Sequence, residues 1–349
     1  MRRLVLCAAL LALALPAYAA DKKPEAPKYK VASTFKLPGD TGWDYLFADA
    51  EDRRLYVAHG IEIQVVDLDT HKSIGTVPGI NGAHGVAVAH AYNHGFAASG
   101  RDSSMVMFDL KTLAVLKRLP VTGGRGCDAL VYEPASHTVY SFNANTRNGV
   151  GLDGETGEYK NTVDLEGAPE FAAVDGRGAV FVNNADSSWV AGFDAKDKKP
   201  RVRWKLAPGE GPSGLAYDPV EGLIFSVCEN KLMTILDVST GKLLQTLPIG
   251  EGSDGVAFDP EMRMAYASCG GSGTMVIAHE DSRKHFVVTQ VVDTEKGART
   301  VTVDPKTHDV YTCTAKFGPR PAPTADRPHP WPSIVPGSFH VMVLSATAK

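Results

Sequence analysis

Six of the seven residues that share one position of an internal repeat can carry charge. The seven are Asp44, His84, Asp128, Glu170, Ser213, Asp254 and Arg299, and we call them the mouth ring. Carboxylates joined by one imidazole are suitable ligands for a divalent cation, so Asp44, His84, Asp128 and Glu170 form a candidate metal site. In an enzyme built on that site, His84, or His59 from an adjacent turn, is the candidate general base.

The same residues can also act without a metal. A small ligand or part of a protein partner could bind directly to a set of charged side chains: Asp44, His84, Asp128, Glu170, Asp254, Arg299, Arg101 and Arg125. The two added arginines would hold a carboxylate or a phosphate. A third interpretation is a solvated network in which Arg299 pairs with Asp44 and Asp254 and no ligand binds.

The repeat that carries these residues has a nearly constant period. Its clearest copies, at 214–219 and 255–260, read Gly-x-Ala-aromatic-Asp-Pro. The fifth residue of each copy, which we call the anchor, falls at positions 49, 89, 133, 175, 218, 259 and 304, so the steps are 40 to 45 residues. A period in this range, with strand patterns between the copies, predicts an all-β fold, a seven-bladed β-propeller.

The propeller explains why the mouth ring is expected to converge. Seven first strands surround one central channel, and each ring residue lies five positions before an anchor. A glycine stands two positions before the ring residue in six repeats, where we expect a tight turn into the channel: Gly42, Gly82, Gly126, Gly211, Gly252 and Gly297. The last repeat lacks a fourth strand, and the N-terminal segment before the first repeat is expected to supply it and close the last blade.

The N-terminus and the charge indicate where the protein works. Residues 1–19 combine two arginines, a short apolar run and a small-residue end, as in a secretory signal peptide, which predicts export to the periplasm. We expect a short leader at 20–28 and a single propeller domain at 29–349. The whole chain carries a formal net charge of −4, which does not suit a nucleic-acid surface. We also expect no membrane span and a monomer.

Two further features lie within the repeats. Cys127, Cys228, Cys269 and Cys313 remain after removal of a signal peptide, and stacked blades are too far apart for most pairs to bridge, so we expect mainly free thiols. The seventh repeat carries a proline-rich loop at 316–338. Its Arg320, Arg327, His329 and Trp331 could cover the channel mouth as a lid, or the loop could simply be exposed.

Segments 55–70 and 255–260 resemble the YVTN-repeat β-propeller family, the YncE-like periplasmic proteins. The Tyr-Val-Thr-Asn tetrad survives loosely at 56–59 and 181–184, and the proline before the first strand survives at Pro169 and Pro212. The resemblance implies a propeller over essentially the whole mature chain and, for function, a binding module. Related propellers include metal-dependent lactonases and lyases, a comparison at the level of fold alone.

Our first functional hypothesis is therefore an exported propeller that binds a small ligand or a periplasmic protein at the mouth ring. The alternative is a metal-dependent lactonase, hydrolase or lyase that uses the ring carboxylates and His84 with one divalent cation. A scaffold that works through its outer surface is a third possibility.

Overall fold

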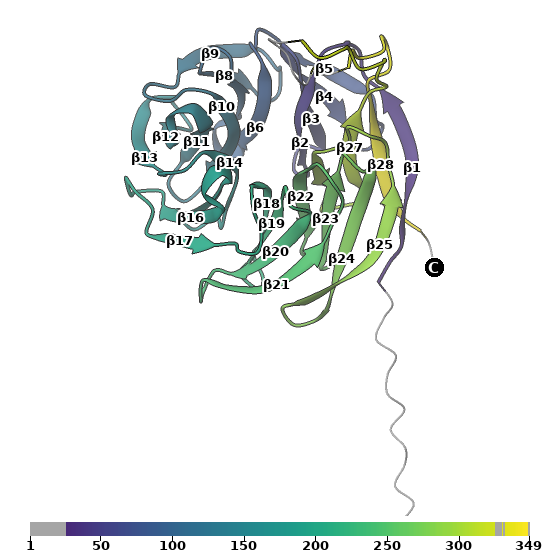
Figure 1. The fold of residues 1–349 in the computed structure, drawn as a ribbon. Helices are drawn as coiled ribbons and strands as arrows, with labels where there is room; N and C mark the ends of the chain where they lie inside the picture. Colours follow the sequence, from purple (N-terminus) through teal and green to yellow (C-terminus); the bar gives the residue numbers. More distant parts are fainter. Residues whose placement is uncertain (1–25, 325–329, 331, 348–349) are drawn as a thin grey trace, which may run out of the picture.

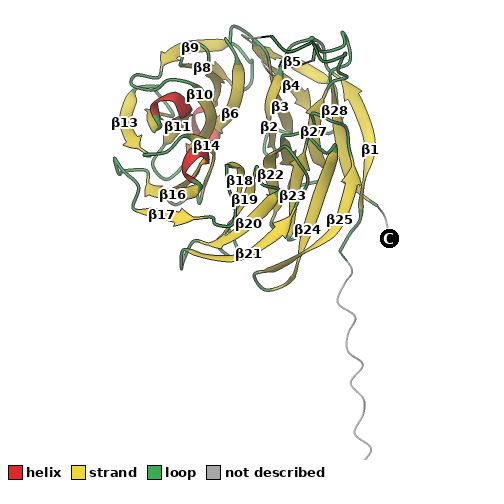
Figure 2. Ribbon diagram, in the orientation of Figure 1, coloured by secondary structure: helices red, strands yellow, loops and turns green. Residues whose placement is uncertain are grey.

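The computed structural model describes residues 26–324, 330 and 332–347. Within them the chain forms seven four-stranded antiparallel sheets arranged as blades around a central channel (Figures 1 and 2). The helical elements in these residues are three single turns: η1 (His90–Tyr92), η2 (Ala144–Thr146) and η3 (Ala185–Ser187). The predicted all-β, seven-bladed architecture is confirmed.

The first three blades each run in chain order from the channel outward. Blade 1 contains β2 (Trp43–Asp49), β3 (Arg54–His59), β4 (Glu62–Asp67) and β5 (Ser73–Val77). Blade 2 contains β6 (Ala83–Ala89), β7 (His94–Ser99), β8 (Ser104–Asp109) and β9 (Val115–Pro120). Blade 3 contains β10 (Cys127–Glu133), β11 (Thr138–Asn143), β12 (Asn148–Asp153) and β13 (Tyr159–Asp164).

The next three blades repeat this order. Blade 4 contains β14 (Pro169–Val174), β15 (Ala179–Asn184), β16 (Trp189–Asp194) and β17 (Val202–Lys205). Blade 5 contains β18 (Pro212–Asp218), β19 (Leu223–Cys228), β20 (Leu232–Asp237) and β21 (Lys242–Pro248). Blade 6 contains β22 (Ser253–Asp259), β23 (Met264–Cys269), β24 (Thr274–Ser282) and β25 (His285–Asp293).

Blade 7 joins the two ends of the chain. It contains β26 (Val301–Val303), β27 (Val310–Thr314), β28 (His340–Ala346) and, outermost, β1 (Tyr29–Lys36). β1 pairs antiparallel with β28, from Tyr29 opposite Ala346 to Lys36 opposite His340. The predicted closure by the N-terminal strand is confirmed, and it leaves no open gap in the ring of blades.

The recurring anchor acid of the repeat has a structural role. The Asp49 carboxylate accepts the backbone N–H of Glu51 at 3.1 Å, and Asp218 and Asp259 make the equivalent turns. These carboxylates are almost fully buried. Because a buried carboxylate needs partners, an acidic anchor fixes the turn after its own first strand, and Ala89 of blade 2 is the one anchor without a carboxylate.

Several anchors also tie neighbouring blades together at this end of the channel. Asp49 lies 3.0 Å from His90 of blade 2, and Asp304 lies 2.8 Å from Arg53 of blade 1. Asp259 pairs with His308 of blade 7 at 2.7 Å. These links join consecutive blades, and we regard them as part of the closure of the ring.

The remaining sequence features are placed as follows. Cys127, Cys228, Cys269 and Cys313 are all buried and free, as predicted. The segments of the proline-rich loop that the structure describes are held at their base by a bridge between Phe317 and Ile334. Gly337 N donates to Asp40 Oδ1 at 2.6 Å. Arg320 is exposed.

Some predicted features fall outside the described residues: the signal peptide at 1–19, most of the leader at 20–28, and Arg327, His329 and Trp331 of the long loop. Residues 26–28 belong to no strand. No helix in the described part of the chain is long and apolar enough to cross a membrane.

Candidate functional site

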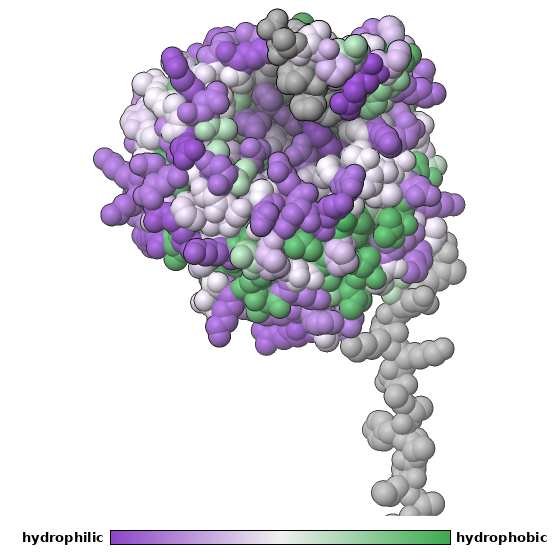
Figure 3. Space-filling model, in the orientation of Figure 1, coloured by the Kyte–Doolittle hydropathy of each residue, from purple (hydrophilic) through white to green (hydrophobic). Residues whose placement is uncertain are grey.

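The mouth ring lies where the chain enters the channel in each blade. Six of its residues are in the first strand of a blade, and Arg299 stands just before β26. Five of the six glycines that precede the ring have positive φ, in agreement with the expected turn: Gly82, Gly126, Gly211, Gly252 and Gly297. Gly42 is the exception, because its φ is not positive. Figure 3 shows a hollow in the middle of the molecule with hydrophilic side chains in and around it.

His84 is held between two aspartates from the neighbouring blades. Its Nδ1 makes a short hydrogen bond with Asp44 Oδ2 and lies 3.1 Å from Asp128 Oδ1. Burial alone would lower the pKa of His84, but the hydrogen bonds and charges of Asp128 and Asp44 outweigh it and raise the pKa to about 10. The imidazole is therefore protonated at neutral pH.

The other edge of the His84 ring lies over the backbone of Gly100, where even a Cβ would come within 2.7 Å of it. Nε2 of His84 has no hydrogen-bond partner among the described residues, and about a third of the His84 side chain is exposed. A glycine just after β7 thus makes room for the imidazole, whose Nε2–H is left available as a donor.

Arg299 is the second cation of the ring. Its Nε donates to Asp254 Oδ2 at 2.8 Å, and its terminal nitrogen lies 3.4 Å from Asp44 Oδ1 and 3.0 Å from the Trp43 carbonyl oxygen. Ser213 Oγ donates to the other Asp254 oxygen at 2.7 Å. The pairing of Arg299 with Asp44 and Asp254 is as the solvated-network interpretation predicted.

Glu170 differs from the other ring acids because the described residues give it neither a hydrogen bond nor an ion pair. Burial, followed by the charges of Asp128 and Asp254, raises the pKa of Glu170 to about 8. The carboxyl is thus mainly protonated at neutral pH. The other five charged ring residues, three aspartates against His84 and Arg299, leave one net negative charge.

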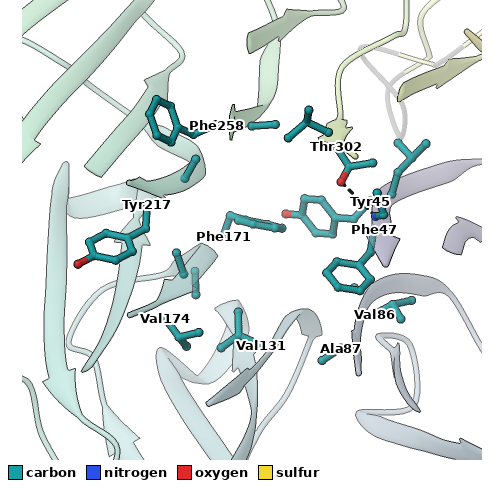
Figure 4. Close-up of a pocket in the computed structure, with 18 of the residues that line it drawn as sticks. Tyr45, Phe47, Val86, Ala87, Val131, Phe171, Val174, Tyr217, Phe258 and Thr302 are labelled. Atoms are coloured by element: carbon teal, nitrogen blue, oxygen red, sulfur yellow. Dashed lines mark hydrogen bonds between the residues drawn. The ribbon is translucent and has the colours of Figure 1, made fainter. Parts of the chain in front are cut away.

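Two aromatic side chains form a floor beneath the ring. Tyr45 of blade 1 and Phe171 of blade 4 meet across the channel with ring centroids 4.8 Å apart, as Figure 4 shows. Burial, and then the surrounding carboxylates, raise the pKa of Tyr45 well above its usual value. The tyrosine is next in sequence to Asp44, so this pair, which we call the aromatic floor, lies directly beneath the charged mouth.

Sequence reasoning missed the floor although a signal was present. The position four before each anchor is occupied by Tyr45, Gly85, Ala129, Phe171, Gly214, Gly255 and Thr300. Five small residues let the first strands approach closely; a Cβ on Gly214 would lie 2.7 Å from Gly255 Cα. The two large residues come from blades on opposite sides of the ring, and only the closed ring brings them into contact.

The other candidate residues are less central. His59 is buried, its Nε2 lies 3.0 Å from the Thr41 carbonyl oxygen, and its ring stacks on Phe339. Burial lowers its pKa. These are the contacts of a packed core histidine, and the described residues that His59 contacts do not belong to the mouth ring. Arg101 and Arg125 are exposed, and Arg101 covers Gly82, two residues before His84.

Two groups of described residues could offer three ligands to a metal ion. Asp44, His84 and Asp128 each provide one donor atom, all within 4.8 Å of one another. Glu170 is not part of this group, so three of the four predicted ligands come together. The second group, Asp49, Asp52 and His90, lies at the opposite end of the first strands and includes the ion pair that links blades 1 and 2.

Comparisons with known proteins establish the fold alone. No protein-family model and no curated protein sequence matches the chain. A chain described as Kuenenia stuttgartiensis hydrazine synthase aligns with a TM-score of 0.67 and 16% identity, over 80% of this chain and 94% of its own length. A chain from a crystal structure of the mitotic checkpoint complex aligns with a TM-score of 0.71 and 13% identity, over 98% of this chain and 100% of its own length. At these identities the likeness is confined to the seven-bladed β-propeller.

Proposed function

We propose that this protein is an exported, monomeric YVTN-type propeller of the periplasm, and that it binds a small ligand bearing a protonated amine at the mouth ring. The observation that carries the proposal is Glu170, a partly buried carboxyl group that has no partner among the described residues and lies beside a ring of net negative charge. Buried polar groups normally have partners, so such a group is a good candidate for contact with a ligand.

The ring supplies complementary chemistry for an amine. An ammonium group placed beside Glu170 would favour the ionised carboxylate, because an opposite charge nearby lowers the pKa of a carboxyl group. The Nε2–H of His84 and the exposed Arg101 and Arg125 would meet acceptor or anionic groups elsewhere on the ligand. A lysine side chain from a protein partner would present the same ammonium group.

The test is a calorimetric titration with two small molecules of similar length and opposite charge, 1,4-diaminobutane and succinate. We expect the diamine to bind and succinate not to bind. Glu170→Gln should weaken diamine binding at least about tenfold, equivalent to about 1.4 kcal/mol. Glu210→Gln, at an exposed glutamate before β18, should leave binding unchanged. Equal affinity in wild type and Glu170→Gln would refute the proposal.

A metal-dependent lactonase, hydrolase or lyase is the second candidate. It is favoured by the convergence of Asp44, His84 and Asp128. In this reading the three side chains would hold a divalent cation, which would polarise a carbonyl group or activate water. Because a metal ligand must be deprotonated, binding of the cation would release the proton that the imidazole holds in the metal-free protein.

Elemental analysis separates the two candidates. Protein purified from the periplasm without chelator would be compared with the Asp44→Ala/His84→Ala double variant. Stoichiometric metal that disappears in the variant would favour the enzyme and direct a screen toward lactones and esters. Wild-type protein without metal would leave direct ligand binding as the function of the ring.

A further inference from the structure

On the other side of the aromatic floor the channel contains a pocket, which we call the vestibule. Its volume is about 540 Å³, within the range of small-molecule sites. All seven first strands contribute to its wall, and Figure 4 shows six of these side chains around the hollow: Phe47, Val131, Val174, Tyr217, Phe258 and Thr302. Pro219, Pro260 and Pro305, which follow their anchors, mark its mouth on the face opposite the ring.

The wall of the vestibule carries no charged side chain. Thr302 Oγ1 already accepts the backbone N–H of Ala48 at 3.1 Å. Phe47, Val131, Val174 and Tyr217 remain partly exposed although they belong to the innermost strands. Covering such apolar surface is favourable, so the wall is suited to an apolar occupant.

The described ends of the chain do not reach this pocket. Lys28 and Thr347 pair with each other beside β1 and β28, and β1 is the outermost strand of blade 7 (Figure 1). Neither described end of the chain therefore fills the pocket. Because the wall has no charged side chain, binding of a charged ligand there is unfavourable. The aromatic side chains of Phe47, Tyr217 and Phe258 offer surfaces on which an aromatic ligand can stack.

We infer that the vestibule is a second binding site, which takes an uncharged, mainly apolar small molecule with an aromatic or alicyclic body. It enters from the face opposite the mouth ring and rests against Phe171 and Tyr45. The site is separate from the one proposed for an amine, so either can fail without the other.

A fluorescence titration with N-phenyl-1-naphthylamine, an uncharged apolar probe, tests this inference. We expect saturable binding at one site per protein. Val131→Phe and Val174→Phe place added bulk in the hollow, and each should weaken binding at least about tenfold. Val115→Phe makes the same kind of change on the exposed face of β9 and should have no effect.

Two checks keep the test decisive. Far-ultraviolet circular dichroism and thermal unfolding establish that each variant is folded, and two independent filling positions are used in case one of them is not. Asp44→Asn, in the mouth ring, should leave probe binding unchanged. Absence of saturable binding to the wild type, retention of binding in the folded filling variants, or loss in Asp44→Asn would each overturn the inference.

Discussion

The two ends of the central channel are built by the same seven strands but from opposite chemistry. At the mouth ring, Asp44, His84 and Arg299 belong to a network of ion pairs that, among the described residues, does not include Glu170. A few residues further along the strands, the vestibule has an uncharged, largely apolar wall. The aromatic floor stands between them. A fold built from seven similar blades can therefore carry two chemically different sites when one pair of side chains lies across its channel.

The largest expected effect concerns the charged end. Arg299→Ala leaves the partly buried Asp254 without a cation and Asp44 with His84 alone. We expect the free energy of unfolding to fall by about 3 kcal/mol, because an uncompensated buried charge is costly. The measurement is urea unfolding at pH 7. Arg101→Ala, at an exposed arginine, should change stability by less than about 0.5 kcal/mol; equal losses would mean that the ring is merely solvated.

The next effect depends on pH and is specific to Glu170. Its pKa rises from 4.5 in the unfolded chain to about 8 in the fold, so the folded state binds more protons between these values. Stability should therefore fall as pH increases from about 4.5 to 8. Glu170→Gln removes this penalty, and we expect it to stabilise the protein by on the order of 2 kcal/mol at pH 8 and to have little effect at pH 4.5.

Thermal unfolding of wild type and Glu170→Gln across this pH range checks the prediction. Glu261→Gln, an exposed glutamate beyond the other end of the channel, serves as the control. A constant difference between wild type and Glu170→Gln at every pH would contradict the raised pKa.

A smaller effect concerns the boundary between the two ends. Phe171→Ala removes half of the aromatic floor, and since the side chain is only partly buried we expect a loss of about 1.5 kcal/mol, below the usual cost at a fully buried phenylalanine. The variant should also let water reach Tyr45 and lower its pKa toward the usual value. Ultraviolet titration of the tyrosines tests this; an unchanged titration would show that Phe171 does not seal the floor.

The sequence predicted the parts of this molecule that repeat. Seven anchors at regular spacing specify seven blades, and the missing fourth strand specifies the closure by β1. The ring position could be found because it has the same offset from every anchor. The sequence showed that an acid recurs at the anchor but not what it does, and the structure adds both its turn and its links to the neighbouring blade through His90, Arg53 and His308.

What the sequence did not reveal depends on contacts across the channel or between side chains. Tyr45 and Phe171 are 126 residues apart, and an alignment of repeats gives no reason for them to touch. The directions of the side chains at the channel mouth decide that Asp44 and Asp128 pair with His84. They also decide that Glu170 has no ion pair among the described residues. The vestibule was hidden because the residues of its wall look like ordinary core positions in each separate strand.

If the aromatic floor divides the channel into two sites, the mouth ring and the vestibule bind their ligands independently. The decisive measurement is a titration of 1,4-diaminobutane into the wild-type protein with and without saturating N-phenyl-1-naphthylamine. We expect one diamine site whose dissociation constant is the same in both titrations. Weakened or abolished diamine binding in the presence of the apolar probe would show that the channel is a single continuous site.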